Sequence, residues 1–198
     1  MTDLATLGFG RSELILGGQK SGKSRRAESL ASDWLGQSPG HKAVLIATAQ
    51  PWDEEMRGRI ARHRQDRAER VPAMRTLEEP LQLAQALASH SNTETLVVVD
   101  CLTLWLTNLL MPVDDFERKP PQVQYFRSQL AMISGAVKQA TGPLVLVGNE
   151  IGLGVIPLGR ETRAFVDALG LLNQELAQVC QRVTLMVAGL PLTLKGQP

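Results

Sequence analysis

The sequence predicts a three-layer α/β domain whose mostly parallel central sheet carries helices on both faces. Short strand-like segments that are apolar throughout alternate with helix-like segments along the chain. Residues 17–24, GGQKSGKS, fit the pattern G-x-x-x-x-G-K-[ST] without a mismatch. An apolar segment precedes this motif and a helical pattern follows it, which is the context that the motif requires. We therefore expect a P-loop NTPase fold of the RecA-like kind.

Composition indicates one globular domain without a strong preference for nucleic acid or membrane. The chain has 198 residues, of which 43% are hydrophobic and 21% charged, and its net charge is +1. Its two cysteines lie far apart and lack zinc-ligand spacing, which favours the reducing cytoplasm. No apolar run approaches the ~20 residues of a membrane span. We expect a catalytic domain at 13–198, preceded by a loosely ordered extension at 1–12 that lacks the features of a signal peptide.

The first half of the chain contains three predicted strands and three predicted helices. In chain order they are a strand at 13–16, a helix at 25–35, a strand at 43–48, helices at 51–70 and 79–88, and a strand at 95–100. The helix at 51–70 has acidic residues in its first turn, which suits a helix N-terminus. Its apolar stripe is little more than Met56 and Ile60. Most of this helix must therefore face water, a ligand or a partner.

The second half continues the alternation. Its predicted elements are an apolar helix at 102–110 containing Trp105 and Asn108, an irregular surface loop at 112–121, a helix at 123–140, a strand at 143–147, a glycine-rich loop at 148–159, a helix at 161–181, a strand at 182–188 and a short edge strand at 192–194. Ligands of parallel sheets bind outside the carboxyl ends of the strands. Residues 17–24, 48–50, 100 and 149–150 occupy those ends, so we expect them to form one site.

The glycine-rich segment is expected to bind the phosphates of a nucleoside triphosphate. Its backbone N–H groups would point inward, and the following helix would add its positive N-terminal end. The residues concerned are Gly17, Gly18, Gln19, Lys20, Ser21 and Gly22. Lys23 would reach the outer phosphates, and Ser24 would ligate Mg²⁺ together with Asp100. The alternatives are a chance glycine-rich turn and, for Asp100, an ordinary polar strand end.

His63 lies among seven arginines, which suggests an anion site. The arginines are Arg57, Arg59, Arg62, Arg64, Arg67, Arg70 and Arg75. They would repel one another unless an anion lay among them, and arginine forks suit phosphate oxygens. In such a setting, His63 could act as a base or attack phosphorus as a covalent nucleophile. Composition alone favours the alternative, a solvated basic helix with an incidental histidine, because charge runs are usually solvated faces.

Several motifs together resemble the bifunctional adenosylcobinamide kinase/adenosylcobinamide-phosphate guanylyltransferases of cobalamin biosynthesis. They are GGQKSGKSR at 17–25, IATAQ at 46–50, DEEMRGRIARHR at 53–64, RTLEEP at 75–80, DCLTLWLTNLL at 100–110 and VGNEIGLGVIP at 147–157. The resemblance covers nearly the whole chain beyond residue 12. Two departures are Arg62, where some members have a second histidine, and Met74, where a tryptophan is expected before Arg75.

The resemblance implies an enzyme that phosphorylates adenosylcobinamide and then transfers GMP to the phosphate through a guanylylated histidine. His63 and Lys23 would then be the catalytic residues. GTP contacts would come from Thr48, Ala49, Gln50, Arg64, Gln65, Asp66, Arg67, Glu78 and Asp100. The resemblance also implies GTP and ATP as substrates, Mg²⁺, a corrinoid acceptor and a homotrimer.

Two rival functions follow from the same residues. A monofunctional P-loop kinase would use His63 only to bind phosphate. A nucleotide-dependent switch or binding module would need a way to read the base, yet the guanine-reading pattern Asn-Lys-x-Asp is missing from the sequence. A nucleic-acid motor is disfavoured by the near-neutral net charge, although the local arginine cluster is typical of anion binding.

Overall fold

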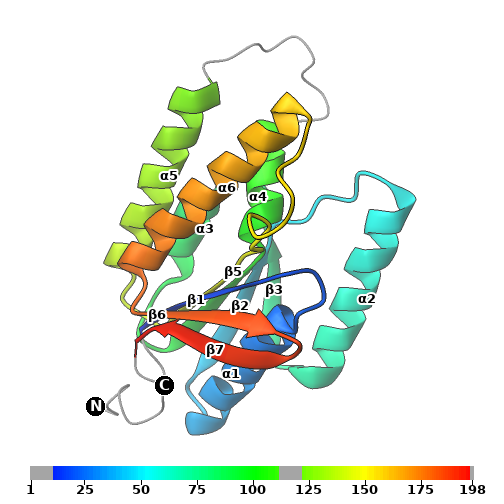
Figure 1. The fold of residues 1–198 in the computed structure, drawn as a ribbon. Coiled ribbons are helices and arrows are strands. Elements are labelled where there is room, and N and C mark those ends of the chain that lie inside the picture. Colours follow the sequence, from blue (N-terminus) through cyan, green and yellow to red (C-terminus); the bar gives the residue numbers. More distant parts are fainter. Residues whose placement is uncertain (1–10, 112–121, 197–198) are drawn as a thin grey trace.

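The computed structural model describes residues 11–111 and 122–196 and contains one seven-stranded sheet (Figure 1). The elements are β1 Ser12–Gly17, α1 Lys23–Gln37, β2 Lys42–Ala47, α2 Glu54–Arg70, β3 Met74–Glu78, α3 Leu83–His90, β4 Thr95–Asp100, α4 Leu102–Leu110, α5 Gln122–Gln139, β5 Leu144–Val147, α6 Arg160–Val179, β6 Arg182–Val187 and β7 Leu190–Lys195. The strand order is β3-β2-β4-β5-β1-β6-β7, and only the β6–β7 pairing is antiparallel. The predicted mostly parallel α/β fold is confirmed.

Each face of the sheet carries its own hydrophobic core. Leu14 and Leu16 of β1 belong to the core under α3, α4, α5 and α6, whereas Ile15 between them belongs to the core under α1. Side chains alternate between faces along a strand, so a central strand buried on both sides must be apolar throughout. This explains why the strand segments are continuous apolar runs, and it confirms the three-layer arrangement.

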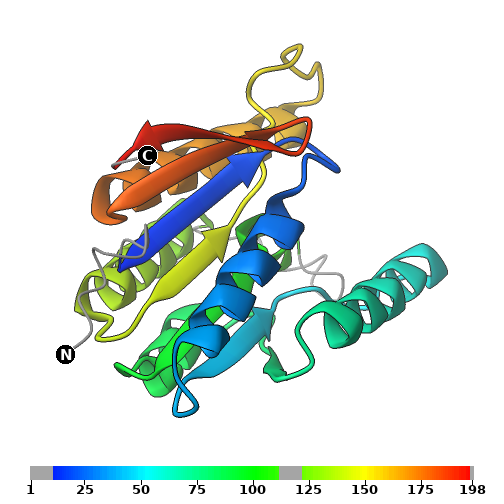
Figure 2. The same cartoon turned by 90° about the horizontal axis from the view of Figure 1, so that it is seen from below.

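Helix α2 stands beside this body rather than in it (Figures 1 and 2). Arg67 is its one buried residue. Neither hydrophobic core, as formed by the described residues, includes a residue of α2. The weak apolar stripe seen in the sequence is therefore matched by weak apolar packing.

The structure corrects several predicted boundaries. Strand β1 begins at Ser12, and Arg11 donates its backbone N–H to Gln181 Oε1, so neither residue belongs to a loose extension. Helix α2 begins at Glu54 because the Asp53 carboxylate caps it, which leaves Pro51 outside. Helix α3 begins at Leu83 rather than at residue 79. The expectations for 1–10 and 112–121 lie outside the described residues.

Strand β3 was missed altogether by the sequence analysis. It pairs with β2 at the edge of the sheet, where Ala47 lies opposite Glu78. Its sequence MRTLE is only partly buried, so it lacks the apolar run that identified the other parallel strands. Within 11–111 and 122–196, every helix is too short or too polar to span a membrane.

Candidate functional site

One cavity of about 840 Å³ lies between the P-loop and α2, beside the carboxyl ends of β2 and β4. Most of the predicted site residues line it. They are Gln19, Lys20, Ser21, Gly22, Lys23, Ser24, Ala49, His63, Arg64, Asp66, Arg67, Glu78 and Asp100. Asn149, at the end of β5, also lines it. The expected convergence of separate strand ends on one site is confirmed by this lining.

The P-loop is held in shape by its backbone. Gly17 has φ +152°, and a Cβ there would come within 2.5 Å of the Met186 carbonyl oxygen. Gly22 has φ +101°, and its Cβ would lie 3.2 Å from Gly189 Cα. Strand β6 and the turn after it therefore press directly against the loop, and the Gly189 N–H also donates to the Ser21 carbonyl at 3.0 Å. Glycine is required at both positions on steric grounds.

Lys23 begins α1 and is buried beneath the loop. Its ammonium donates to the Gly18 carbonyl at 2.6 Å. Burial lowers the pKa of Lys23, while the charge of Asp100 acts in the opposite direction. Gly22 is the N-cap of α1 and provides no side-chain cap, and the first turn holds no acidic residue. The helix N-terminus is therefore available to an anion.

Thr48 supports the floor of the cavity instead of lining it. Its fully buried hydroxyl donates to the Cys101 carbonyl at 2.7 Å and accepts the Cys101 N–H at 3.0 Å. Asn108 of α4 donates its amide to the Thr48 carbonyl at 2.8 Å. These bonds fix the backbone beside Asp100. The sequence signal for Asn108 was a polar residue within an apolar helix, which could have been read as a buried hydrogen-bonding group.

Cys101 forms part of the same support. Its buried sulfur accepts the Leu104 N–H at 3.5 Å at the start of α4. Burial raises the pKa of the Cys101 thiol to about 12, and the charge of Asp100 acts in the same direction. A thiol that stays protonated is neither a nucleophile nor a metal ligand, so Cys101 has a structural role.

Four other predicted residues do not line the cavity. Gly17 and Gly18 belong to the loop but are not among the residues that line the cavity, and Gln50 follows the end of β2. Gln65 is exposed and donates its amide to Glu69 Oε1 at 3.1 Å on the same helix. The structure therefore separates Gln65 from its neighbours Arg64 and Asp66, which face the cavity.

Ion pairs hold α2 against the rest of the molecule. Arg64 pairs with Glu78 at the end of β3. Arg70 donates to Glu28 of α1 at 2.7 Å, and it lies 3.4 Å from Asp66. The hydrogen bond to Glu28, followed by its charge, raises the pKa of Arg70.

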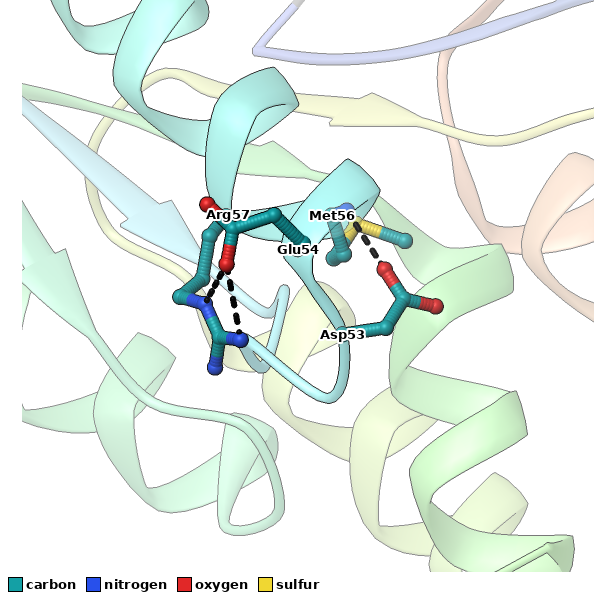
Figure 3. Close-up of polar contacts among 4 residues, drawn as sticks. All are labelled: Asp53, Glu54, Met56 and Arg57. Carbon is teal, nitrogen blue, oxygen red and sulfur yellow. Dashed lines mark hydrogen bonds and ion pairs between the residues drawn. The ribbon is translucent and has the colours of Figure 1, made fainter.

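The remaining contacts of α2 revise the idea that only a bound anion could hold the arginines together. At the other end of α2, Arg57 pairs with Glu54 beside the cap formed by Asp53 (Figure 3). Three of the seven arginines, Arg57, Arg64 and Arg70, are thus paired with carboxylates of the protein. Glu28, which faces the same cavity, was not identified from the sequence.

Arg67 and His63 are the α2 residues best placed to meet a ligand. Arg67 is 9% exposed, and burial lowers its pKa while the charges of Asp100 and Glu28 act in the opposite direction. His63 is exposed on the cavity wall one turn earlier. Among the described residues, none forms a hydrogen bond or ion pair with the His63 ring. Its ring nitrogens are therefore not occupied by these residues.

The start of the 148–159 loop is attached to the site. Asn149 accepts a hydrogen bond from Asn173 of α6 at its carbonyl and donates its N–H to the Thr103 hydroxyl at 2.9 Å. Glu150 donates its N–H to the Gly17 carbonyl at 3.1 Å. These bonds connect β5, α4 and α6 to the P-loop.

The arrangement suits magnesium held partly by phosphate rather than a metal enclosed by protein. Within the described ranges, no group of three or more His, Cys, Asp or Glu side chains is placed to hold a metal ion. Ser24 and Asp100 instead offer two oxygen-bearing side chains to the same cavity. Mg²⁺ keeps several waters and takes only one or two protein oxygens when it is bound with substrate phosphates. The residues therefore fit this ion.

Comparisons with known proteins agree with this geometry. The sequence model of the family described as cobinamide kinase / cobinamide phosphate guanyltransferase matches residues 13–194. The chain is 49% identical over 186 residues to a bifunctional adenosylcobalamin biosynthesis protein, CobP, of Pseudomonas aeruginosa, covering 94% of this chain and 98% of that one. It is 34% identical to the CobU protein of Escherichia coli and 33% identical to that of Salmonella typhimurium, each over 92% of this chain and 98% of the relative.

Proposed function

The chain belongs to the cobinamide kinase / cobinamide phosphate guanyltransferase family, and we propose that its two reactions share one cavity in which His63 carries GMP. The protein is a bifunctional enzyme of adenosylcobalamin biosynthesis that acts as a kinase and as a guanylyltransferase. The observation that supports a shared site is that the P-loop and the exposed His63 line the same cavity.

In the kinase half, the P-loop amides and the N-terminus of α1 bind a triphosphate, either ATP or GTP. Lys23 neutralises charge on the outer phosphates as the γ-phosphoryl group moves to the hydroxyl of adenosylcobinamide. Ser24 and Asp100 would hold Mg²⁺, which supplies further positive charge to the phosphates when bound. Arg67 lies beside Asp100 and adds a cation to the same wall.

In the transfer half, a ring nitrogen of His63 attacks the α-phosphorus of GTP. A P–N bond forms, the bond from the α-phosphorus to its bridging oxygen breaks, and pyrophosphate leaves. A phosphate oxygen of adenosylcobinamide phosphate then attacks the same phosphorus. The P–N bond breaks, the GDP-linked corrinoid is released and His63 is regenerated. Arg64 and Arg67 would stabilise charge on phosphate oxygens during both attacks.

The proposal extends to the domain organisation, location and oligomeric state of the protein. A single catalytic domain, which begins at Arg11 rather than at residue 13, would act in the cytoplasm as a homotrimer, without nucleic acid. The family resemblance supports the trimer, and light scattering on the purified protein would test it.

Replacing His63 by Asn is the decisive test of the covalent step. Asparagine keeps a polar side chain and removes the imidazole nucleophile. With α-labelled GTP, the wild-type protein should retain label after denaturation, and that label should be acid-labile and base-stable. H63N should show no label and no pyrophosphate release while still phosphorylating adenosylcobinamide. H90N is the matched control, because His90 lies outside the cavity and bonds to the Ala86 carbonyl.

Two outcomes would contradict the proposal. Label that persists in H63N would show that another residue carries GMP. A parallel loss of both reactions through KM would instead indicate that His63 only binds phosphate, as in a monofunctional kinase.

A further inference from the structure

The two ends of α2 are attached to the molecule in different ways. At its C-terminal end, Val71 directly follows the helix, is 4% exposed and belongs to the core under α1. At its N-terminal end, Asp53 and Glu54 are exposed, and the pair between Glu54 and Arg57 lies within the helix itself (Figure 3). Helix α2 is therefore fixed at its C-terminal end, and its position depends on what holds that end.

The pair between Arg70 and Glu28 is the closest polar contact at this fixed end. Arg70 Nη1 lies 2.7 Å from Glu28 Oε2; the Arg70 side chain is 45% exposed, but the Glu28 side chain is only 6% exposed. By contrast, the side chains in the Arg64–Glu78 pair are 55% and 58% exposed. A buried carboxylate that loses its partner is strongly destabilised, whereas an exposed pair contributes little. Glu28 therefore restrains α2 much more firmly than Glu78 does.

We propose that Glu28 and Arg70 are positioning residues for GMP transfer, because their pair fixes the angle at which α2 presents His63 to the P-loop. The proposal rests on the role of His63 in the proposed function. It adds a role for Glu28, which lies on α1 one turn beyond Ser24 and so connects α2 to the phosphate-binding helix itself.

Geometry explains why a contact so far from His63 affects the reaction. Arg70 lies seven positions after His63, which corresponds to about 10 Å along the helix axis. A tilt of about 10° at the C-terminal end would move His63 by about 2 Å. A misplacement of about 1 Å in a reacting group can cost ~100-fold in rate. Loosening the Arg70–Glu28 pair should therefore slow attack by His63 without removing any group that reacts.

The Arg64–Glu78 pair is not suited to this task. The residues of both pairs line the cavity, but only Arg64 and Glu78 are expected to contact GTP, so nucleotide binding would exchange their mutual contact for contacts to the ligand. The Arg70–Glu28 pair can persist through that exchange, since Glu28 is a buried residue of α1.

The test measures three kinetic quantities in E28Q, R70Q and the double variant E28Q/R70Q. They are the single-turnover rate of His63 labelling by α-labelled GTP, the KM for GTP in that step, and the kinase rate. We expect E28Q and R70Q each to slow labelling by ~10-fold or more, with the KM for GTP changed by less than ~3-fold. The kinase rate should stay within ~2-fold of wild type, which also shows that the P-loop is folded.

The double variant and two further variants separate positioning from other roles. If the pair acts as a unit, E28Q/R70Q should be no slower than the worse single variant. R70K, which keeps the charge, should recover part of the labelling rate. E54Q breaks the exposed pair at the other end of α2 and should label at the wild-type rate, because that pair does not connect the helix to the body.

Normal labelling in E28Q would overturn the positioning role, and so would additive losses in the double variant. Equal losses of kinase and labelling in E28Q would also overturn it, because they would indicate a general structural defect. Failure of the covalent mechanism is a separate result, since it would appear as persistent label in H63N.

Discussion

The P-loop and α2 face each other across one cavity, but different forces hold them in place. The P-loop is fixed by close backbone contacts, with Gly17 and Gly22 pressed against β6 and the turn after it. Helix α2 contributes nothing to either hydrophobic core and is held mainly by arginine–carboxylate pairs. The comparison indicates a preformed triphosphate site opposite an adjustable histidine. This division suits the proposed mechanism, in which one reaction would proceed without His63 and the other would require it.

Removing Lys23 should have the largest effect on activity. Its ammonium is the buried cation at the P-loop, and without it charge on the outer phosphates is not neutralised as bonds break. We expect K23A to lower kcat/KM for kinase and for His63 labelling by ~100- to 1,000-fold each. K138A, on the exposed side of α5, is the control. Labelling that survives in K23A would show that the arginines of α2 can bind GTP without Lys23. That result would contradict the assignment of triphosphate binding to the P-loop.

Replacing Gly17 by Ala should have the largest effect on stability. The new Cβ would lie 2.5 Å from the Met186 carbonyl oxygen and 2.6 Å from Ser21 Oγ, at a backbone φ of +152°. Because displacing backbone atoms costs considerable free energy, we expect the free energy of unfolding to fall by about 3 kcal/mol or more and the Tm to fall by ~6 °C or more. G18A is the matched control, because a Cβ at Gly18 meets nothing within 4 Å. An unchanged Tm in G17A would mean that the loop is less tightly packed than this comparison requires.

The same contrast explains what the sequence could predict. The position of the loop at 17–24 was predicted because its residues are contiguous and the motif fixes their spacing. The other parallel strands were predicted because a strand that is buried on both faces must be apolar throughout. Strand β3 was missed because a strand at the edge of a sheet does not need an apolar run. Its sequence MRTLE contains no fully buried residue and carries charge.

Contacts between distant residues account for what was missed. Glu28 and Arg70 are 42 positions apart, and no local pattern announces their pair. Thr48 was expected to touch GTP, yet its hydroxyl bonds to Cys101, which is 53 positions away. Both roles depend on how β2, β4 and the helices are placed in space. The sequence therefore predicted which elements form the site more reliably than which side chains face into it.

The pH dependence of Lys23 provides a test of intermediate size. Burial lowers the pKa of Lys23 from its usual value of 10.5, so the folded enzyme loses this proton at a lower pH than the unfolded chain does. Both reactions should therefore weaken on the alkaline side before pH 10.5 is reached. Over the same window the free energy of unfolding should rise with pH through this group, because the unfolded chain binds more protons there.

A pH profile of kcat/KM for the kinase step would measure the alkaline limb directly. K23R, which keeps a cation that does not titrate in this range, should move that limb to higher pH. A limb that is unchanged in K23R would assign it to another group. Saturating triphosphate should also move the limb to higher pH, because bound phosphates favour the charged lysine.

Replacing Gly58 by Ala should give the smallest effect and the finest test of the comparison. Gly58 lies inside α2, and a Cβ there meets nothing within 4 Å, so alanine should stabilise the helix by about 0.5–1 kcal/mol. If α2 opens separately from the core, G58A should raise hydrogen-exchange protection in α2 by ~2- to 5-fold while the global Tm hardly changes. G135A is the matched control, because Gly135 lies inside α5, which packs into the core through Phe126 and Ile133, and it also has open space around it. There the same gain should appear in the global Tm, as a rise of ~1–4 °C. If G58A raised the Tm as much as G135A does, α2 would unfold together with the core, and the idea of an adjustable histidine helix would be wrong.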